Sequence, residues 1–141
     1  MRTDELAFDY IERAEITFEE ARNAAQNEVY SLAIRRSQET VELSLKAALR
    51  YLAIEYPREH DVSNVLLQLK ETRQLPNWFE ERIDFMANAS SNLARKRGPA
   101  FYGEERTFTP ASQIFTEEES LRALRDAEEV LEICKRLIKQ K

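Results

Sequence analysis

The densest basic cluster in the sequence stands next to a pair of aromatic residues. Arg95, Lys96 and Arg97 are followed by Phe101 and Tyr102. Cations pair with phosphate oxygens and exposed rings stack on bases, so this combination is typical of sites that hold nucleotides or single-stranded RNA. A structural interpretation is also open, because cations at the C-terminal end of a helix are stabilised by the helix dipole.

An acidic and a basic residue, Glu42 and Lys46, stand four positions apart in the order that favours pairing on a helix. On an exposed face such a pair is a solvated salt bridge that contributes little to stability. On a face that lines a cleft between two subunits, the same side chains would belong to a binding site. The candidate nucleotide- or RNA-binding residues are therefore Glu42, Lys46, Arg95, Arg97, Phe101 and Tyr102.

The chain has one histidine, His60, and one cysteine, Cys134. His60 could act as a general base or a ligand, but a loop histidine that simply precedes Asp61 is the plainer interpretation. Cys134 falls within an apolar helical stripe, which indicates a buried thiol. A single cysteine excludes an internal disulfide and cysteine-rich zinc sites. With only one histidine as well, we expect neither a metal site nor a cofactor.

The composition argues against several classes of function. With 21 basic and 26 acidic residues the net charge is −5, which argues against avid, sequence-independent binding to duplex nucleic acid. Only 2 glycines are present, too few for a P-loop or a dinucleotide-binding loop. The longest uncharged runs, 85–94 and 107–116, are too short to span a bilayer. No signal peptide is evident, so we expect a cytoplasmic protein without a membrane segment.

The periodicity of apolar residues predicts five helices, at residues 4–26, 31–56, 62–73, 77–97 and 116–139, with the first two antiparallel. Polar residues that could cap four of them are Ser31, Asp61, Asn77 and Thr116. Pro57 and Gly98-Pro99 are expected to stop the second and fourth helices. Residues 98–115 form the one long loop, whose aromatic residues either pin it over the core or serve a function. The chain is expected to be a single all-α domain over residues 1–141.

The second predicted helix carries two apolar faces. The first includes Ile34, Gln38, Val41, Leu45, Ala48 and Leu52, and the second includes Leu43, Ala47, Tyr51 and Ile54. Such a helix either lies at the centre of the fold or also packs on a partner chain. The second interpretation predicts a homodimer with a two-fold contact.

Segments along the sequence resemble, in the right order, the motifs of one family. The second predicted helix carries Gln38, Glu42 and Lys46-Ala47 at spacings of four, and the third opens with His60-Asp61-Val62. The fourth is followed, from Arg97, by Gly-Pro-Ala-Phe-Tyr-Gly103, and Phe115-Thr116 stands at the start of the last helix. Over residues 4–138 the chain resembles HEPN domains.

The resemblance implies an up-and-down bundle of four long helices plus one short helix, paired as a symmetric homodimer. Many HEPN proteins are metal-independent endoribonucleases, in which two copies of an R-x4–6-H motif meet across the dimer cleft. Others bind nucleotides, or are the partner of a minimal nucleotidyltransferase in a toxin–antitoxin pair. In such pairs a tyrosine near the motif receives AMP from the partner, and Tyr102 is the matching candidate here.

The chain departs from the nuclease motif, because the position of the histidine is occupied by Tyr102. A phenol, with an ordinary pKa of about 10, transfers protons poorly at neutral pH. We therefore predict a non-catalytic homodimeric module in which Arg95 and Arg97 hold phosphate and Phe101 or Tyr102 stacks on a base, or which docks a nucleotidyltransferase. One alternative is an endoribonuclease with a degenerate motif, in which Arg97 and Tyr102 are catalytic. The other is a structural helical dimer without a ligand.

Overall fold

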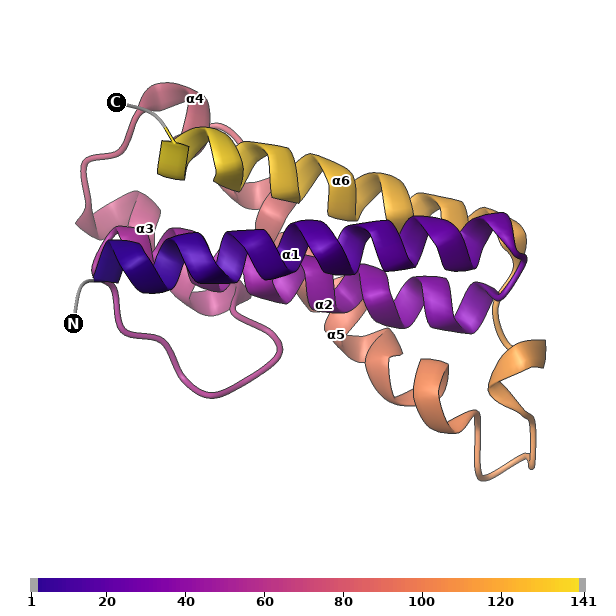
Figure 1. Ribbon diagram of the computed structural model, residues 1–141. Coiled ribbons are helices and arrows are strands. Elements are labelled where there is room, and N and C mark those ends of the chain that lie inside the picture. Colours follow the sequence, from indigo (N-terminus) through magenta and orange to yellow (C-terminus); the bar gives the residue numbers. More distant parts are fainter. Residues whose placement is uncertain (1–2, 140–141) are drawn as a thin grey trace.

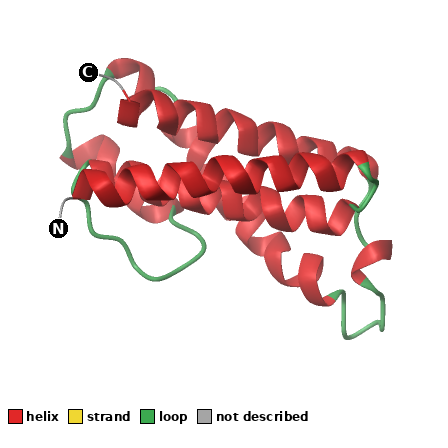
Figure 2. Ribbon diagram, in the orientation of Figure 1, coloured by secondary structure: helices red, strands yellow, loops and turns green. Residues whose placement is uncertain are grey.

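The computed structural model describes residues 3–139, which form helices joined by loops (Figure 1). The elements are α1 (Thr3–Gln26), α2 (Tyr30–Tyr51), α3 (Ser63–Thr72), α4 (Asn77–Glu80), α5 (Ile83–Tyr102), the 3-10 turn η1 (Ala111–Gln113) and α6 (Glu117–Lys139). Four are long, α3 is shorter, and α4 and η1 are single turns. Figure 2 shows no strand within these residues. The prediction of an all-α bundle with four long helices and one short helix is confirmed.

Helix α2 lies at the centre of the bundle. It packs against α1, α5 and α6, and α1 and α2 run antiparallel, as predicted (Figure 1). One face of α2 is fully buried, with Ile34, Leu45 and Leu49 at 0% exposure. The opposite face, with Leu43 and Tyr51, is partly buried against the same core. Neighbours within the chain therefore account for the two apolar faces of α2.

Helix α2 ends five residues earlier than predicted, at Tyr51 instead of residue 56. Ala53 adopts a left-handed conformation with φ 60°, and the N–H groups of Ala53 and Ile54 bond to the carbonyls of Arg50 and Leu49. This is a Schellman motif, which satisfies the last carbonyls of a helix and turns the chain away. The helix thus stops well before Pro57, and residues 52–62 become a loop.

The predicted fourth helix, 77–97, begins at residue 77 as predicted, but it is interrupted after residue 80 and continues beyond residue 97. Residues 77–80 form the separate turn α4, and α5 continues through Gly98 and Pro99 to Tyr102. Proline disfavours a helical residue before it partly because its ring meets that residue's Cβ. Gly98 has no Cβ, so the helix passes through Pro99 at a lower cost.

Two of the expected N-caps are wrong and two keep a capping role. Val29 and Pro76 occupy the cap positions that were expected for Ser31 and Asn77, without a side-chain cap hydrogen bond. Asp61 precedes the cap residue Val62, but its carboxylate accepts the Ser63 N–H at 2.9 Å. Thr116 and Glu119 form the predicted capping box, in which each side chain accepts the other residue's N–H at 3.1 Å.

The C-terminal turns of α5 and the loop to η1, residues 98–113, project from the bundle and are here named the arm (Figure 1). An isolated antiparallel bridge between Glu104 and Thr109 closes its loop. Phe101, Tyr102 and Phe108 are exposed to 59%, 70% and 93%. Of the aromatic residues in the predicted loop, Phe115 alone is buried and pins the chain to the core.

The arm depends on Gly103, which ends α5 with φ 78° and ψ −166°. This region of backbone space is open almost only to glycine, and a Cβ at this position would lie 2.4 Å from the Thr109 carbonyl oxygen. We expect Gly103→Ala to lower the free energy of unfolding by more than about 1 kcal/mol, measured by urea denaturation.

Gly98→Ala is the matched control, because a Cβ there meets no neighbouring segment. Alanine raises the helix propensity at this position, but its Cβ meets the ring of Pro99. Because these effects oppose each other, we expect the free energy of unfolding to change by no more than about 0.5 kcal/mol. Equal effects of the two substitutions would contradict this account of the arm.

Candidate functional site

A continuous chain of side-chain contacts runs along α2 and joins α5 to the loop before α3. Arg97 donates from Nη1 to the Gln38 Oε1 at 2.5 Å, and Gln38 donates from Nε2 to the Glu42 Oε1 at 2.9 Å. Lys46 and His60 contact the same carboxylate, each at 2.8 Å. These five residues are named the Gln38 network, and Gln38 at its middle is 2% exposed.

The helical period explains why one helix can carry this chain of contacts. Gln38, Glu42 and Lys46 follow one another at spacings of four, which places them on one face of α2. Arg97 reaches the start of this row from α5, and His60 reaches its carboxylate from the 52–62 loop. Residues distant in sequence thus meet on a single rigid helix.

A second carboxylate, Glu39, ties Arg97 to the arginines of the first turns of α2. The Glu39 Oε2 lies 3.2 Å from the Arg35 Nε and 3.7 Å from the Arg97 Nη1, and its Oε1 lies 2.7 Å from the Arg36 Nη1. Three guanidinium groups thus surround one carboxylate. This end of the site keeps an excess of positive charge.

The aromatic pair of the arm lies beside this positive end. The Arg35 guanidinium stacks over the Phe101 ring at 4.6 Å from its centroid. The Phe101 and Tyr102 rings meet edge to face at 4.6 Å. Both side chains remain largely exposed, so a ligand can reach them.

Glu42 is the carboxylate of the Gln38 network, and its side chain is 16% exposed. Burial favours its neutral form, but hydrogen bonds from Lys46, Gln38 and His60 outweigh burial and lower the pKa of Glu42 below its ordinary value. Because the ionised carboxylate only accepts hydrogen bonds, the Nδ1 of His60 carries the proton of their contact. Glu42 therefore fixes the orientation of the imidazole.

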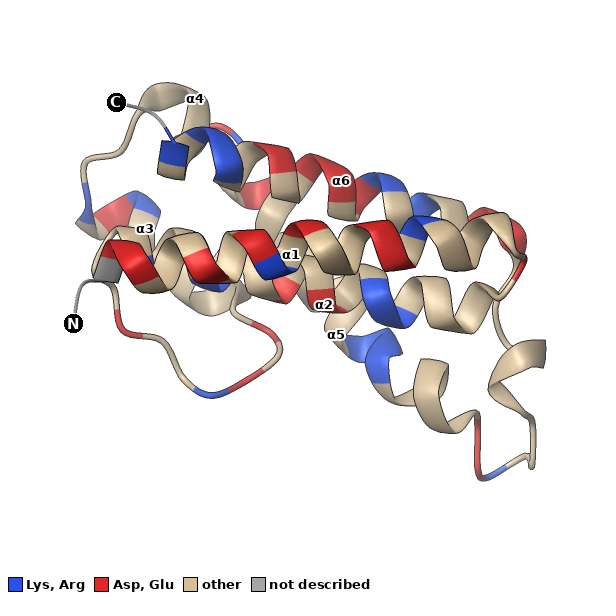
Figure 3. Ribbon diagram, in the orientation of Figure 1, with Lys and Arg blue, Asp and Glu red and all other residues tan. Residues whose placement is uncertain are grey.

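The structure brings together most of the predicted site residues but separates one of them. Glu42, Lys46 and Arg97 belong to the Gln38 network, and Phe101 adjoins it through Arg35. Arg95 instead bonds to Ser91 and Asn92 and lines a different cavity, of about 380 Å³, together with Lys96 and Pro99. In Figure 3 the basic segments of α2 and α5 lie close together at the base of the arm.

The contributions of Gln38, Glu39 and Arg35 were not predicted from the sequence, and His60 was interpreted as a loop residue. Gln38 is among the residues that carry the resemblance to HEPN domains. Its place as a polar residue on an apolar helix face was the signal in the sequence. His60 is in a loop and its side chain is 53% exposed, as that interpretation expects, but its bond to Glu42 places it in the site.

Cys134 is fully buried, as predicted, and burial alone raises its pKa well above the ordinary value of a thiol. Among residues 3–139, no three His, Cys, Asp or Glu side chains come together in a group that could hold a metal ion. No helix in that part of the chain is long and apolar enough to cross a membrane.

The depressed pKa of Glu42 makes a prediction about stability. A carboxylate whose folded pKa is lowered stabilises the fold above its unfolded pKa, and this contribution is lost as the pH falls through the folded pKa. We expect Glu42→Gln to cost about 1–3 kcal/mol at neutral pH, since charge-assisted bonds from three neighbours are weakened. The loss should shrink below about pH 4.5, near the ordinary pKa of a glutamate.

Urea denaturation measures the loss of unfolding free energy at neutral and at acidic pH. Glu12→Gln, at an exposed position of α1, is the charge-matched control. A cost for Glu42→Gln that does not depend on pH would contradict this role of its charge.

Comparison with known proteins agrees with this architecture. A family model described as "HEPN domain" matches residues 7–137. The chain is 30% identical over 137 residues to a Methanocaldococcus jannaschii protein named "Putative toxin MJ1304", covering 94% of this chain and 88% of that one.

Two crystal structures have the same fold. One is ST0689, described as an archaeal HEPN homologue, with a TM-score of 0.70 and 25% identity over 99% of each chain. The other is TT1696 from Thermus thermophilus, with a TM-score of 0.71 and 22% identity over 93% of this chain and 97% of that one. With a family match across nearly its whole length, the chain belongs to the HEPN domain family.

Proposed function

We propose that this chain is a homodimeric HEPN module that binds a nucleotide or the single-stranded part of an RNA at Arg97 and the adjacent rings, and that it does not cleave its ligand. The observation that carries the proposal is the position of Arg97. Its guanidinium is held by Gln38 and Glu39, and Arg35, which contacts the same Glu39, stacks on the exposed ring of Phe101. Phosphate pairing beside a stacking platform is the usual arrangement for single-stranded ligands.

Arg97 has donors to offer to a ligand. Within residues 3–139 its contacts with other side chains involve only Nη1, whereas a guanidinium has five N–H donors. Its side chain is 22% exposed, so the group is accessible but held in place. A held arginine loses less conformational freedom on binding phosphate than a free one.

The proposal that the module does not cleave RNA rests on the groups available for proton transfer. Tyr102 stands where the nuclease motif has histidine, and it is 70% exposed. The single histidine, His60, is separated from Arg97 by Gln38 and Glu42 within the network. No imidazole therefore lies next to Arg97 in the described part of the chain.

The arm supports a role in protein interaction. It carries three exposed aromatic side chains, Phe101, Tyr102 and Phe108, and clustered exposed rings typically mark contact surfaces. The similar Methanocaldococcus jannaschii protein carries the name "Putative toxin MJ1304". We therefore assign this chain to the toxin–antitoxin class of HEPN proteins, with a minimal nucleotidyltransferase as its partner and Tyr102 as the accessible tyrosine.

The binding site is tested by three substitutions on α5. Arg97→Ala should weaken binding of a short single-stranded RNA by about 1.5–3 kcal/mol, the value of a charge-assisted hydrogen bond. Tyr102→Phe should keep most of the affinity, because its ring still stacks. Arg95→Ala removes the same charge but points to another cavity, so its effect should be smaller. Fluorescence anisotropy at constant ionic strength measures all three.

A larger loss from Arg95→Ala than from Arg97→Ala would contradict the assignment of the site. Cleavage of RNA by the purified wild type in the absence of metal, abolished by Arg97→Ala, would overturn the non-catalytic function in favour of the endoribonuclease. The absence of any RNA or nucleotide binding would favour a structural dimer.

The partner is tested by native mass spectrometry of the chain purified from its own host. We expect a mass of two chains, with nucleotide or a nucleotidyltransferase retained. With partner and ATP, the chain should gain the mass of AMP, and Tyr102→Phe should not. A monomer at micromolar concentration would contradict the homodimer.

A further inference from the structure

A second polar pocket lies at the opposite end of the Gln38 network, between α1, α2 and the 52–62 loop. Its volume is about 380 Å³, and its lining includes Tyr10, Arg50, Tyr56 and Arg58, together with Glu42, Lys46 and His60 of the Gln38 network. A neighbouring hollow of about 290 Å³ shares Arg50, Tyr56 and Arg58. Pockets of about 300 Å³ are large enough for small ligands.

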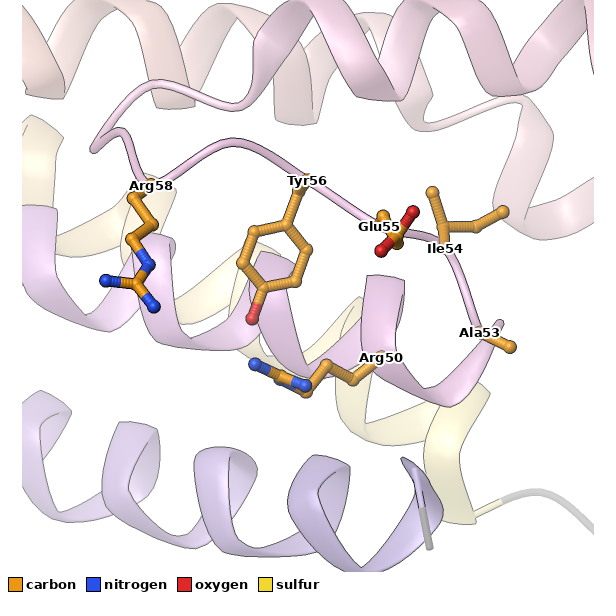
Figure 4. A pocket seen from close by; sticks show the side chains of 6 residues that line it. All are labelled: Arg50, Ala53, Ile54, Glu55, Tyr56 and Arg58. Atoms are coloured by element: carbon orange, nitrogen blue, oxygen red, sulfur yellow. The ribbon is translucent and has the colours of Figure 1, made fainter. Parts of the chain in front are cut away.

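Two polar atoms in this pocket are buried without a partner. Among residues 3–139, neither the Arg50 Nε nor the Tyr56 hydroxyl makes a hydrogen bond of ordinary length and angle, although both are shielded from solvent and Tyr10 and Arg50 lie near enough to the hydroxyl to perturb its pKa. In Figure 4 the Tyr56 ring descends from the loop so that its hydroxyl points to the Arg50 guanidinium, and Arg58 extends to the same side. Buried donors without partners are rare in folded proteins and call for an explanation.

The pocket also has cations that carboxylates do not neutralise. Lys46 pairs with Glu42 at 2.8 Å, but Arg50 and Arg58 have no carboxylate within 4.0 Å among the described residues. The Arg50 guanidinium instead lies between two rings, 5.5 Å from the Tyr10 centroid and 5.4 Å from the Tyr56 centroid. Glu42 also lines the pocket, but its carboxylate contacts Lys46 and His60. Glu55 and Glu59 are exposed, so water screens their repulsion of an anion.

Tyr56 is suited to donate a hydrogen bond. Burial, together with the neighbouring Tyr10, raises the pKa of Tyr56 above its ordinary value, so the phenol keeps its proton at neutral pH. Two guanidinium groups offer only donors, and the protonated phenol adds one O–H donor to a ligand that enters between them.

From this geometry we infer that the pocket formed by Arg50, Tyr56 and Arg58 is a binding site for a phosphate group, separate from the site at Arg97. The oxygens of a phosphate accept hydrogen bonds from guanidinium groups in a bidentate manner and would satisfy the two buried donors. The phosphate is either inorganic or the terminal phosphate of a nucleotide or RNA.

The test is a titration of the full-length protein with inorganic phosphate, followed by ³¹P NMR at constant ionic strength. We expect saturable binding that weakens about tenfold or more in Arg58→Gln and in Arg50→Gln, because each loses a charge-assisted bond. Tyr56→Phe should weaken binding by a smaller factor. Arg106→Gln removes the same charge from an exposed position of the arm and should leave the affinity unchanged.

Arg50 is packed between rings, so its substitution could disturb the fold, whereas Arg58 is exposed on the loop and serves as the decisive variant. Equal affinities of Arg58→Gln and Arg106→Gln would overturn the inference, as would the absence of saturable binding to wild type. The phosphate titration of Arg58→Gln and the RNA titration of Arg97→Ala test different residues, so a failure of this inference and a failure of the proposed function can be distinguished.

A second series of titrations distinguishes the two possible sources of the phosphate. A 5′-phosphorylated dinucleotide is compared with its 5′-hydroxyl counterpart and with inorganic phosphate. Tighter binding of the phosphorylated dinucleotide than of inorganic phosphate, lost in Arg58→Gln, identifies a nucleic-acid end as the ligand. Equal affinity for phosphorylated dinucleotide and inorganic phosphate identifies free phosphate. Equal affinity for the two dinucleotides in wild type would overturn the inference, because the phosphate would then contribute nothing.

Discussion

The buried amide of Gln38 is the interaction on which the rest of the site depends. At 2% exposure its oxygen and nitrogen must both find partners, because an unpaired buried polar group costs about 1–3 kcal/mol. The oxygen accepts from Arg97 and the nitrogen donates to Glu42. One side chain therefore fixes a cation on α5 and a carboxylate on α2, and through that carboxylate it fixes His60 and Lys46. A substitution of Gln38 therefore removes hydrogen bonds to both Arg97 and Glu42.

The central position of α2 makes this arrangement possible. Because α1, α5 and α6 surround it, its polar row at Gln38, Glu42 and Lys46 lies at a shielded edge of the bundle, where water competes less for the hydrogen bonds. The two proposed sites lie at either end of this row. Arg97 and the rings of the arm form one, and Arg50, Tyr56 and Arg58 form the other.

Much of the fold could be predicted from the sequence, because helical periodicity dominates it. The stripe of Ala7, Ile11, Ala14 and Phe18 is buried, as expected, and the Thr116 capping box begins α6. The end of α2 could not be predicted, since Ala53 adopts the left-handed conformation that usually identifies itself by a glycine. The passage of α5 through Gly98-Pro99 was missed because each residue alone indicates a helix end.

The grouping of Arg95 with Arg97 has a different cause from the misplaced helix end. Residues two apart on a helix point in nearly opposite directions, and both residues already fall within the predicted helix 77–97, so the helical period itself argued against one shared ligand. Gln38 was placed on an apolar face and His60 was considered as a base or ligand, but their contacts were not predicted, because contacts between residues 18 and 59 positions apart leave no periodic signal in one sequence.

The central claim is that Gln38 positions Arg97 for binding without touching the ligand, and a double-mutant cycle tests it most directly. RNA affinity is measured for wild type, Gln38→Met, Arg97→Ala and the double variant; methionine keeps the volume of glutamine but not its hydrogen bonds. We predict that Gln38→Met weakens binding, and that the double variant binds no more weakly than Arg97→Ala alone. Losses that simply add, or full affinity in Gln38→Met, would contradict the account.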